Sequence, residues 1–218
     1  KFDKKTERLK LIFNKIKPNR FQKLVRFFYN IILMKFVKKH WSNILFFTFL
    51  VLLIIPQTRM PIQVFVQRLV SFSPSEKDKA EREKMENYQW SLQQLNGKEI
   101  NFSQSKNKVT IVNFWATWCP PCVAEMPSFQ KLYDAYGGKV DFYFITSEES
   151  EKVKRFLQKN EYTLPVFLQE QQAPKQLRSQ ALPTTYVISK TGEIIIDEEG
   201  AADWNSEKTR ILLDNLLK

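Results

Sequence analysis

Apolar and polar positions follow two different periods along residues 88–218. Runs rich in β-branched and aromatic residues are bounded by turn residues, and between several of them apolar residues recur every three or four positions. Strands are expected at 88–92, 99–102, 109–115, 140–146, 165–168, 184–189 and 193–196. Helices are expected at 119–136, 150–160 and 174–180, with a last helix that Ser206 caps. This order predicts an α/β domain with a mixed central sheet flanked by helices.

A continuous apolar run occupies residues 41–55, and Pro56 follows it. No charged residue occurs between Lys39 and Arg59, a gap of 19 residues that is close to the ~20 needed to cross a bilayer. A buried core helix would show an amphipathic pattern, and a cleaved signal peptide would have a shorter leader and a small-residue cleavage site. We therefore predict that the fold includes an N-terminal transmembrane helix, a signal anchor at 41–57.

The net charge of +11 belongs to the first 40 residues. Residues 1–40 hold 13 Lys and Arg against two acidic residues, whereas residues 41–218 hold 21 basic and 21 acidic residues. A basic groove on the domain is not implied, so no nucleic-acid partner is expected. The arm at 1–40 is expected to lie on anionic lipid at the cytoplasmic side, the alternative being a partly disordered tail. This orientation places the domain outside the cytoplasm, in a bacterium the periplasm or the outer face of the inner membrane.

Residues 58–87 are expected to connect the anchor to the domain, which then spans 88–218. Apolar residues recur at helical spacing between Ile62 and Val70. This pattern favours a short amphipathic helix that rests on the outer leaflet or packs against the domain. A polar run follows at 76–87, and we expect it to be a solvated helix or tether.

The chain has two cysteines, Cys119 and Cys122, which stand between a predicted strand and a predicted helix. The unpaired N–H groups and the dipole at the first turn of a helix stabilise a thiolate, so this spacing is typical of a dithiol that closes to a disulfide and reopens. Cys119 is expected to be the exposed nucleophile and Cys122 the buried resolving thiol. Pro120 and Pro121 sacrifice no helical hydrogen bond in a first turn.

Other roles for a pair of cysteines at this spacing fit the sequence less well. Zinc needs about four ligands, and no histidine stands near the pair. Haem attachment needs a histidine after the second cysteine, where Val123 stands. A purely structural disulfide would close too short a loop to stabilise the fold. We expect neither a metal nor a cofactor.

Two motifs resemble the thioredoxin superfamily, in particular the membrane-anchored bacterial branch typified by TlpA and ResA. The first is Asn-Phe-Trp-Ala-Thr-Trp-Cys-Pro-Pro-Cys at 113–122, and the second is Leu-Pro-Thr-Thr at 182–185. The resemblance covers about residues 88–218 and implies a thioredoxin-like fold. It also implies thiol–disulfide oxidoreductase activity for the dithiol.

The resemblance carries further positions into the predicted site. In this family the proline before the later strand is cis and lies beside the dithiol, a place that Pro183 would take. The backbone of Leu182 would then pair with an extended substrate segment. Trp118 and Thr184 are expected to take part in binding the same substrate.

Three more residues are placed by the resemblance. Pro127 matches the proline that kinks the active-site helix, and Asn113 stands where cytosolic thioredoxins bury an aspartate. Glu125 matches the acidic residue that this branch places near the dithiol, and it is predicted to tune thiol acidity or to relay a proton, the alternative being an ordinary exposed glutamate. A peroxide-reducing enzyme would have a threonine three residues before its reactive cysteine, where Ala116 stands.

These observations predict a membrane-tethered enzyme that reduces disulfides in exported proteins, with apocytochrome c as the typical substrate of the branch. Its electrons would come from a transmembrane thiol carrier, and a tether would confine the domain near such a donor. A disulfide-forming oxidase of the same fold is one alternative. A non-enzymatic membrane-anchored scaffold is the other.

Overall fold

The computed structural model describes residues 18–218, apart from the side chains of some residues before Thr58. The chain divides into two compact units, Lys1–Thr58 and Arg59–Lys218. Residues 1–17 of the predicted basic arm lie outside the described residues.

Helix α2 (Pro18–Ile54) makes up most of the first unit and contains much of the predicted anchor. Apolar side chains along this part of α2 are exposed, and no described residue of the unit buries them. They are Ile44, Leu45, Phe46, Phe47, Phe49, Leu50, Val51 and Leu52. Among the described residues, no helix is both long and apolar enough to cross a membrane, so the membrane helix of the predicted fold stays a prediction.

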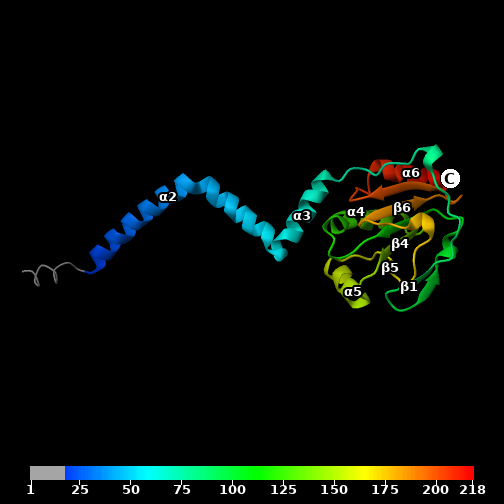
Figure 1. Ribbon diagram of the computed structural model, residues 1–218, viewed down its shortest axis with the longest axis horizontal. Coiled ribbons are helices and arrows are strands. Elements are labelled where there is room, and N and C mark those ends of the chain that lie inside the picture. The colour runs from blue at the N-terminus through cyan, green and yellow to red at the C-terminus, as the bar shows by residue number, and fades with distance from the viewer. Residues whose placement is uncertain (1–17) are drawn as a thin grey trace, which may run out of the picture. The chain divides into compact units, whose positions relative to one another are not determined.

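The second unit is built on a seven-stranded sheet in the order β2-β1-β5-β4-β3-β6-β7 (Figure 1). Its strands are β1 (Ser91–Gln94), β2 (Glu99–Asn101), β3 (Thr110–Phe114), β4 (Asp141–Thr146), β5 (Val166–Gln169), β6 (Thr184–Ile188) and β7 (Ile194–Glu199). The pairs β3–β4 and β4–β5 are parallel, and the other pairs are antiparallel. The sheet therefore contains both parallel and antiparallel pairs, and helical crossovers join the parallel strands. This confirms the predicted α/β fold with a mixed sheet.

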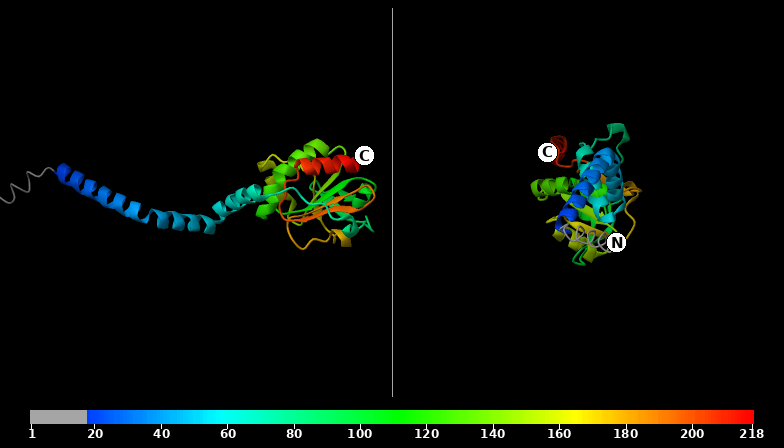
Figure 2. Two further views of the ribbon diagram at one scale, coloured as in Figure 1. Left: turned by 90° about the horizontal axis from the view of Figure 1, so that it is seen from above. Right: turned by 90° about the vertical axis from the view of Figure 1, so that its left-hand side faces the viewer.

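Three helices, α4 (Pro120–Tyr136), α5 (Ser150–Lys159) and α6 (Glu207–Leu217), lie on one side of the sheet (Figure 2, left). Strand β3 runs through the middle of the sheet and is buried along its whole length. Its side chains alternate between two cores, with Ile111 in the core beneath the helices and Val112 in the core on the opposite face. This central strand carries the chain directly into the loop that holds the dithiol.

The predicted tether at 76–87 is wrong, because this segment runs along the outer edge of β7. Lys77 N–H donates to the Ile195 carbonyl at 2.8 Å, and Ile194 N–H donates to the Glu83 carbonyl at 2.9 Å. Met85 is buried in the second core. The segment contains a short 3₁₀ turn, η1 (Lys79–Glu81). Backbone pairing explains the disagreement: an edge strand offers unpaired N–H and C=O groups to any extended neighbour, whatever its side chains.

The helix predicted at 174–180 is also wrong, since only the 3₁₀ turn η3 (Lys175–Leu177) forms there. Ser179 Oγ bonds to both the carbonyl and the N–H of Ala181, at 2.6 and 3.1 Å. Such local side-chain bonds compete with helical ones. A second short turn, η2 (Phe102–Ser105), ends the strand that was predicted to reach 102. The helix expected between Ile62 and Val70 is present as α3 (Pro56–Val70).

Candidate active site

Cys119 and Cys122 are joined by a disulfide with an S–S distance of 2.05 Å. The chain leaves β3 at Phe114, and Cys119 is the N-cap of α4. Its sulfur accepts the Cys122 N–H at 3.3 Å, and its carbonyl accepts the Val123 N–H at 3.0 Å. One of the unpaired N–H groups of the first turn therefore points at the first sulfur, which is the arrangement that stabilises a thiolate there.

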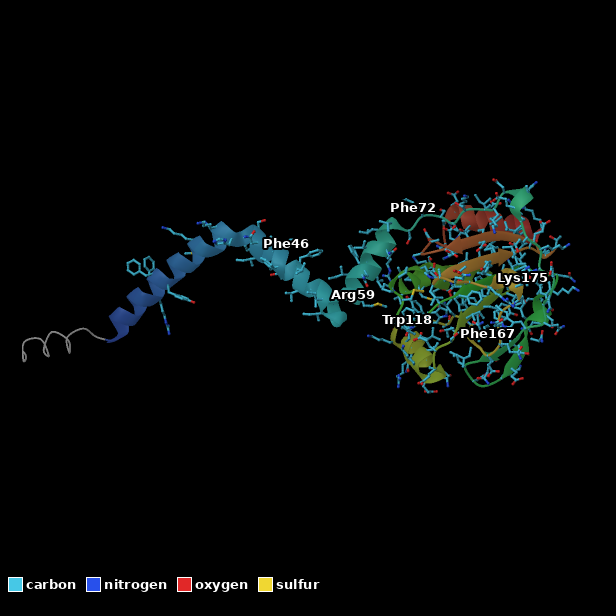
Figure 3. The ribbon with its side chains drawn as sticks, in the orientation of Figure 1. Phe46, Arg59, Phe72, Trp118, Phe167 and Lys175 are labelled. Atoms are coloured by element: carbon cyan, nitrogen blue, oxygen red, sulfur yellow. A yellow bond between two sulfur atoms is a disulfide. The ribbon has the colours of Figure 1, made fainter. Side chains whose placement is uncertain are left out.

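The prediction that Cys119 is exposed is wrong for the disulfide form. Cys119 has 3% of its surface exposed, and Cys122 has none. The sulfur of Cys119 is turned toward the first turn of α4, where it bonds to the sulfur of Cys122. The neighbouring Trp118 is 62% exposed instead (Figure 3).

A groove of about 330 Å³ lies beside the loop that leads from β3 to the dithiol, although neither cysteine lines it. Trp118 and Leu182 both line it, although they come from loops more than sixty positions apart. The Leu182–Pro183 peptide bond is cis, as the resemblance implies. Pro183 and Thr184 are buried, and the Thr184 hydroxyl is engaged with Ser179 and Ala181. Of the four predicted substrate-binding residues, the structure therefore brings two together at the groove.

Glu148 also lines the groove, and sequence reasoning did not select it. Its carboxylate accepts the backbone N–H and the hydroxyl of Thr117, and it pairs with Lys152 one turn along α5. Burial opposes ionisation of Glu148, but the hydrogen bonds from Lys152 and Thr117 outweigh it and lower the pKa. These bonds tie the dithiol loop to the start of α5.

Glu125 lies inside the protein on α4, with 1% of its surface exposed. Asn113 Nδ2 donates to Oε1 at 2.8 Å, while Trp204 Nε1 and the Ala202 N–H donate to Oε2 at 2.9 and 3.3 Å. Glu125 stands three positions after Cys122, so the two side chains share a face of the helix. The alternative of an ordinary exposed glutamate is wrong.

Burial raises the pKa of Glu125 from its ordinary value of 4.5 to about 8. Hydrogen bonds from Trp204, Asn113 and Ala202 lower the pKa, and the negative charge of Glu198 raises it, but desolvation is the largest effect. A carboxyl group with such a pKa exchanges its proton near neutral pH, in the range where an ordinary thiol also titrates.

Asn113 links Glu125 to the cis-proline strand. Its Nδ2 donates both to Glu125 and to Thr185 Oγ1, each at 2.8 Å. Its Oδ1 is buried and has no hydrogen-bond partner. A neutral amide thus stands beside the carboxyl group, so Glu125 has no second buried acid next to it to share its proton.

The comparison with protein families decides the classification. The AhpC/TSA family matches residues 84–196, which is more than half of the chain. The chain belongs to the AhpC/TSA family. In the part that the structure describes, no cluster of three or more potential metal ligands occurs.

Curated relatives agree with this family. The chain is 35% identical over 109 residues to the thioredoxin-like protein YneN of Bacillus subtilis, a match that covers 48% of this chain and 64% of YneN, just under two thirds. It is 33% identical over 127 residues to the thiol-disulfide oxidoreductase ResA of Bacillus thuringiensis, covering 57% of this chain and 70% of ResA. The prediction of a thiol–disulfide oxidoreductase is confirmed at the level of the family and of its disulfide.

A solved structure agrees with the fold. The thioredoxin domain of a thiol-disulfide oxidoreductase from Bacteroides vulgatus matches with a TM-score of 0.50 at 16% identity, and the match covers 62% of this chain and 99% of that domain. The predicted thioredoxin-like arrangement of sheet and helices is thereby confirmed.

Trp204 and Thr185 complete the surroundings of Glu125 and were not predicted. Trp204 follows β7 in a short loop before α6 and stacks on Phe129 with ring centroids 5.0 Å apart. Nothing local marks it as a partner of a glutamate 79 positions earlier. Thr185 was visible only as part of the second motif, with no sign that it would meet Asn113.

Proposed function

We propose that the protein is a membrane-tethered reductase of disulfides in exported proteins, working outside the cytoplasm through Cys119 and Cys122. The observation that carries the proposal is the disulfide at the N-terminus of α4, one turn from a buried carboxyl group and beside a groove that Trp118 and Leu182 line. This arrangement combines a nucleophile, a proton acceptor and a place for substrate.

Exchange begins with the reduced dithiol. The Cys119 thiolate attacks one sulfur of the substrate disulfide, which forms a mixed disulfide and releases the other substrate sulfur as a thiolate that takes up a proton. Cys122 then loses its proton and attacks the sulfur of Cys119, which releases the second substrate thiolate. The substrate gains two electrons, and the enzyme is left with the disulfide seen in the structure.

Glu125 is the group that we assign to the proton of Cys122. It lies on the same face of α4, it is shielded from water, and its pKa of about 8 suits exchange with a thiol. No other buried carboxyl group occurs among the described residues. As Cys122 becomes a nucleophile, the ionised form of Glu125, whose share grows as pH rises toward 8, accepts its proton inside the protein.

The groove gives the substrate its place. Leu182 is partly exposed, and its backbone at the cis peptide bond is offered for pairing with an extended segment. The exposed ring of Trp118 supplies an apolar surface at the other wall. An unfolded exported protein, such as an apocytochrome c, presents a disulfide in an extended segment of this kind.

The proposed tether and location are supported by the exposed apolar residues of α2 and by the basic residues that precede them. The apolar side chains of α2 are exposed among the described residues, and an apolar surface of this extent requires a cover. A bilayer would provide one, and the basic residues before it would keep that end in the cytoplasm. Electrons would then reach the disulfide from a thiol carrier that crosses the membrane.

The reduction potential of the Cys119–Cys122 couple tests the direction of exchange. A reductase is expected to equilibrate near the potential of thioredoxin, about −270 mV, whereas an oxidase would lie near about −120 mV. The measurement is equilibration in glutathione or dithiothreitol buffers, with the two redox forms separated after alkylation. A value at the oxidising end would overturn the reductase and support the disulfide-forming alternative.

A further inference from the structure

Helix α3 carries apolar side chains on two opposite faces. Within the second unit, Val64 is buried against the domain, and Arg68 Nε donates to the Ala124 carbonyl at 3.4 Å. On the opposite face Phe65 and Leu69 are 63% and 69% exposed. The inner face is explained by the fold of the domain, but the outer one is not.

The outer face continues past the end of the helix. Val66 and Val70 stand next to Phe65 and Leu69, and both are at least half exposed. Phe72, just beyond α3, is 80% exposed, the largest exposure among the large apolar residues that the structure describes. Five neighbouring apolar residues thus form a continuous outer patch, consisting of Phe65, Val66, Leu69, Val70 and Phe72 (Figure 3 labels Phe72 at its end). A patch of this kind on a helix marks a surface that something covers.

The charge of this stretch favours a lipid surface as the cover. Residues 56–75 contain Arg59 and Arg68 and no acidic residue. Large apolar side chains beside basic ones are the composition of helices that lie in the headgroup layer of an anionic bilayer. Position along the chain agrees, because α3 begins directly after the apolar run that ends at Ile55.

We infer that the outer patch of α3 inserts into the outer surface of the bilayer and seats the catalytic domain on it. This inference rests on the membrane tether proposed above, and it adds a second, separate lipid contact. The catalytic domain then has a restricted orientation at the membrane, because the inner side of α3 is hydrogen-bonded to it.

Two hydrogen bonds connect α3 and the residues just after it to segments next to the active site. Arg68 reaches the carbonyl of Ala124, two residues after Cys122. The carbonyl of Phe72 accepts the Asp203 N–H at 2.9 Å, between the two residues that donate to Glu125. A lipid-seated α3 would therefore hold the first turns of α4 close to the membrane surface. The dithiol would meet a membrane-embedded thiol donor in a fixed orientation.

The test separates the two lipid contacts in the full-length chain. A protease site is placed between Thr58 and Arg59, the boundary of the two units, and the protein is bound to vesicles of phosphatidylcholine and phosphatidylglycerol. Flotation is measured before and after cleavage. The released domain is expected to stay with these vesicles and to bind more weakly to phosphatidylcholine alone, because Arg59 favours anionic lipid.

Serine substitution of Phe65, Leu69 and Phe72 together is expected to weaken partitioning of the cleaved domain at least tenfold, since burying even a part of three such side chains is worth about that factor. Ile211→Ser is the matched control, because Ile211 is 54% exposed on α6 and lies outside the patch. Its domain is expected to float like the unsubstituted one. Thermal unfolding of each variant checks that the fold is kept.

Each other outcome is decisive. Release of the domain on cleavage, with the uncleaved chain still afloat, overturns the role of α3 and leaves the anchor standing. Retention of the domain while residues 1–58 are lost overturns the anchor and supports α3. Equal flotation of the triple variant, or a cleaved domain that pairs with a second copy through the patch in light scattering, also overturns the inference.

Discussion

A Cys122→Ser variant is expected to accumulate covalent adducts with disulfide-containing proteins through Cys119. The first attack needs only Cys119, whereas release of the substrate needs the second thiol, so the mixed disulfide has no internal route to resolution. Turnover is expected to fall to the uncatalysed background. The measurement uses the reduced variant with insulin as the probe, read as a dithiothreitol-sensitive band on a non-reducing gel.

Cys119→Ser is the matched control. Cys122 is fully buried in the first turn of α4, whereas Cys119 precedes the helix next to the exposed Trp118. The control is therefore expected to give few or no adducts. Adducts formed through Cys122 instead would reverse the roles assigned to the two cysteines. The same trap applied to exported proteins would identify the natural substrate.

Glu125 is expected to make the stability of the oxidised protein fall as pH rises. Its folded pKa of about 8 lies above the value of 4.5 expected in the unfolded chain, so between these values the folded protein holds a proton that the unfolded one has released. The contribution is present below pH 4.5 and is lost as pH rises through about 8. Within that window the slope reaches at most about 1.4 kcal/mol per pH unit.

Urea unfolding of residues 59–218 at pH 5, 7 and 9 measures this effect, with Glu125→Gln as the comparison. The amide does not titrate, so the stability of the unsubstituted protein relative to the variant is expected to fall by a few kcal/mol across the range. Glu170→Gln, at an exposed glutamate, serves as the control and is expected to change little. A pH-independent difference between Glu125 and Gln would contradict the raised pKa.

Trp204→Phe tests the cause of that pKa. The indole N–H donates to Oε2 and lowers the pKa of Glu125, although desolvation raises it more. Phenylalanine keeps an aromatic ring against Phe129 but cannot donate. The pKa is expected to rise further in this variant, which the carboxyl infrared band would report.

The local elements of the domain were predictable because their signals are local. The apolar run of β3, the two prolines after Cys119 and the glycine pair after Tyr136 mark a strand, a helix start and a helix end. The cis bond at Pro183 followed from the resemblance, since a cis bond before proline leaves no periodic trace. The mixed sheet followed from the alternation of strands and helices, whereas the order of its strands was not predicted.

The hydrogen bonds around Glu125 were not predictable in the same way. They join residues from β3, α4 and the loop before α6, and the Trp204 bond spans 79 positions. From sequence alone, a single glutamate in a helix is expected to be exposed, because its burial depends on partners that only the folded sheet brings near it. Likewise, the polar side chains of 76–87 predicted a solvated segment. Its position is determined instead by backbone hydrogen bonds to β7, which the side chains do not reveal.

The pairing of that segment with β7 bears on how the catalytic domain should be produced in isolation. A fragment started at residue 88, where the sequence alone places the boundary, would strip β7 of the N–H and C=O partners that Lys77 and Glu83 provide. It would also remove Met85 from the second core. The unpaired edge of β7 could then form hydrogen bonds with the same edge of another copy. Aggregation during purification would therefore result from the choice of starting residue and not from the enzyme itself.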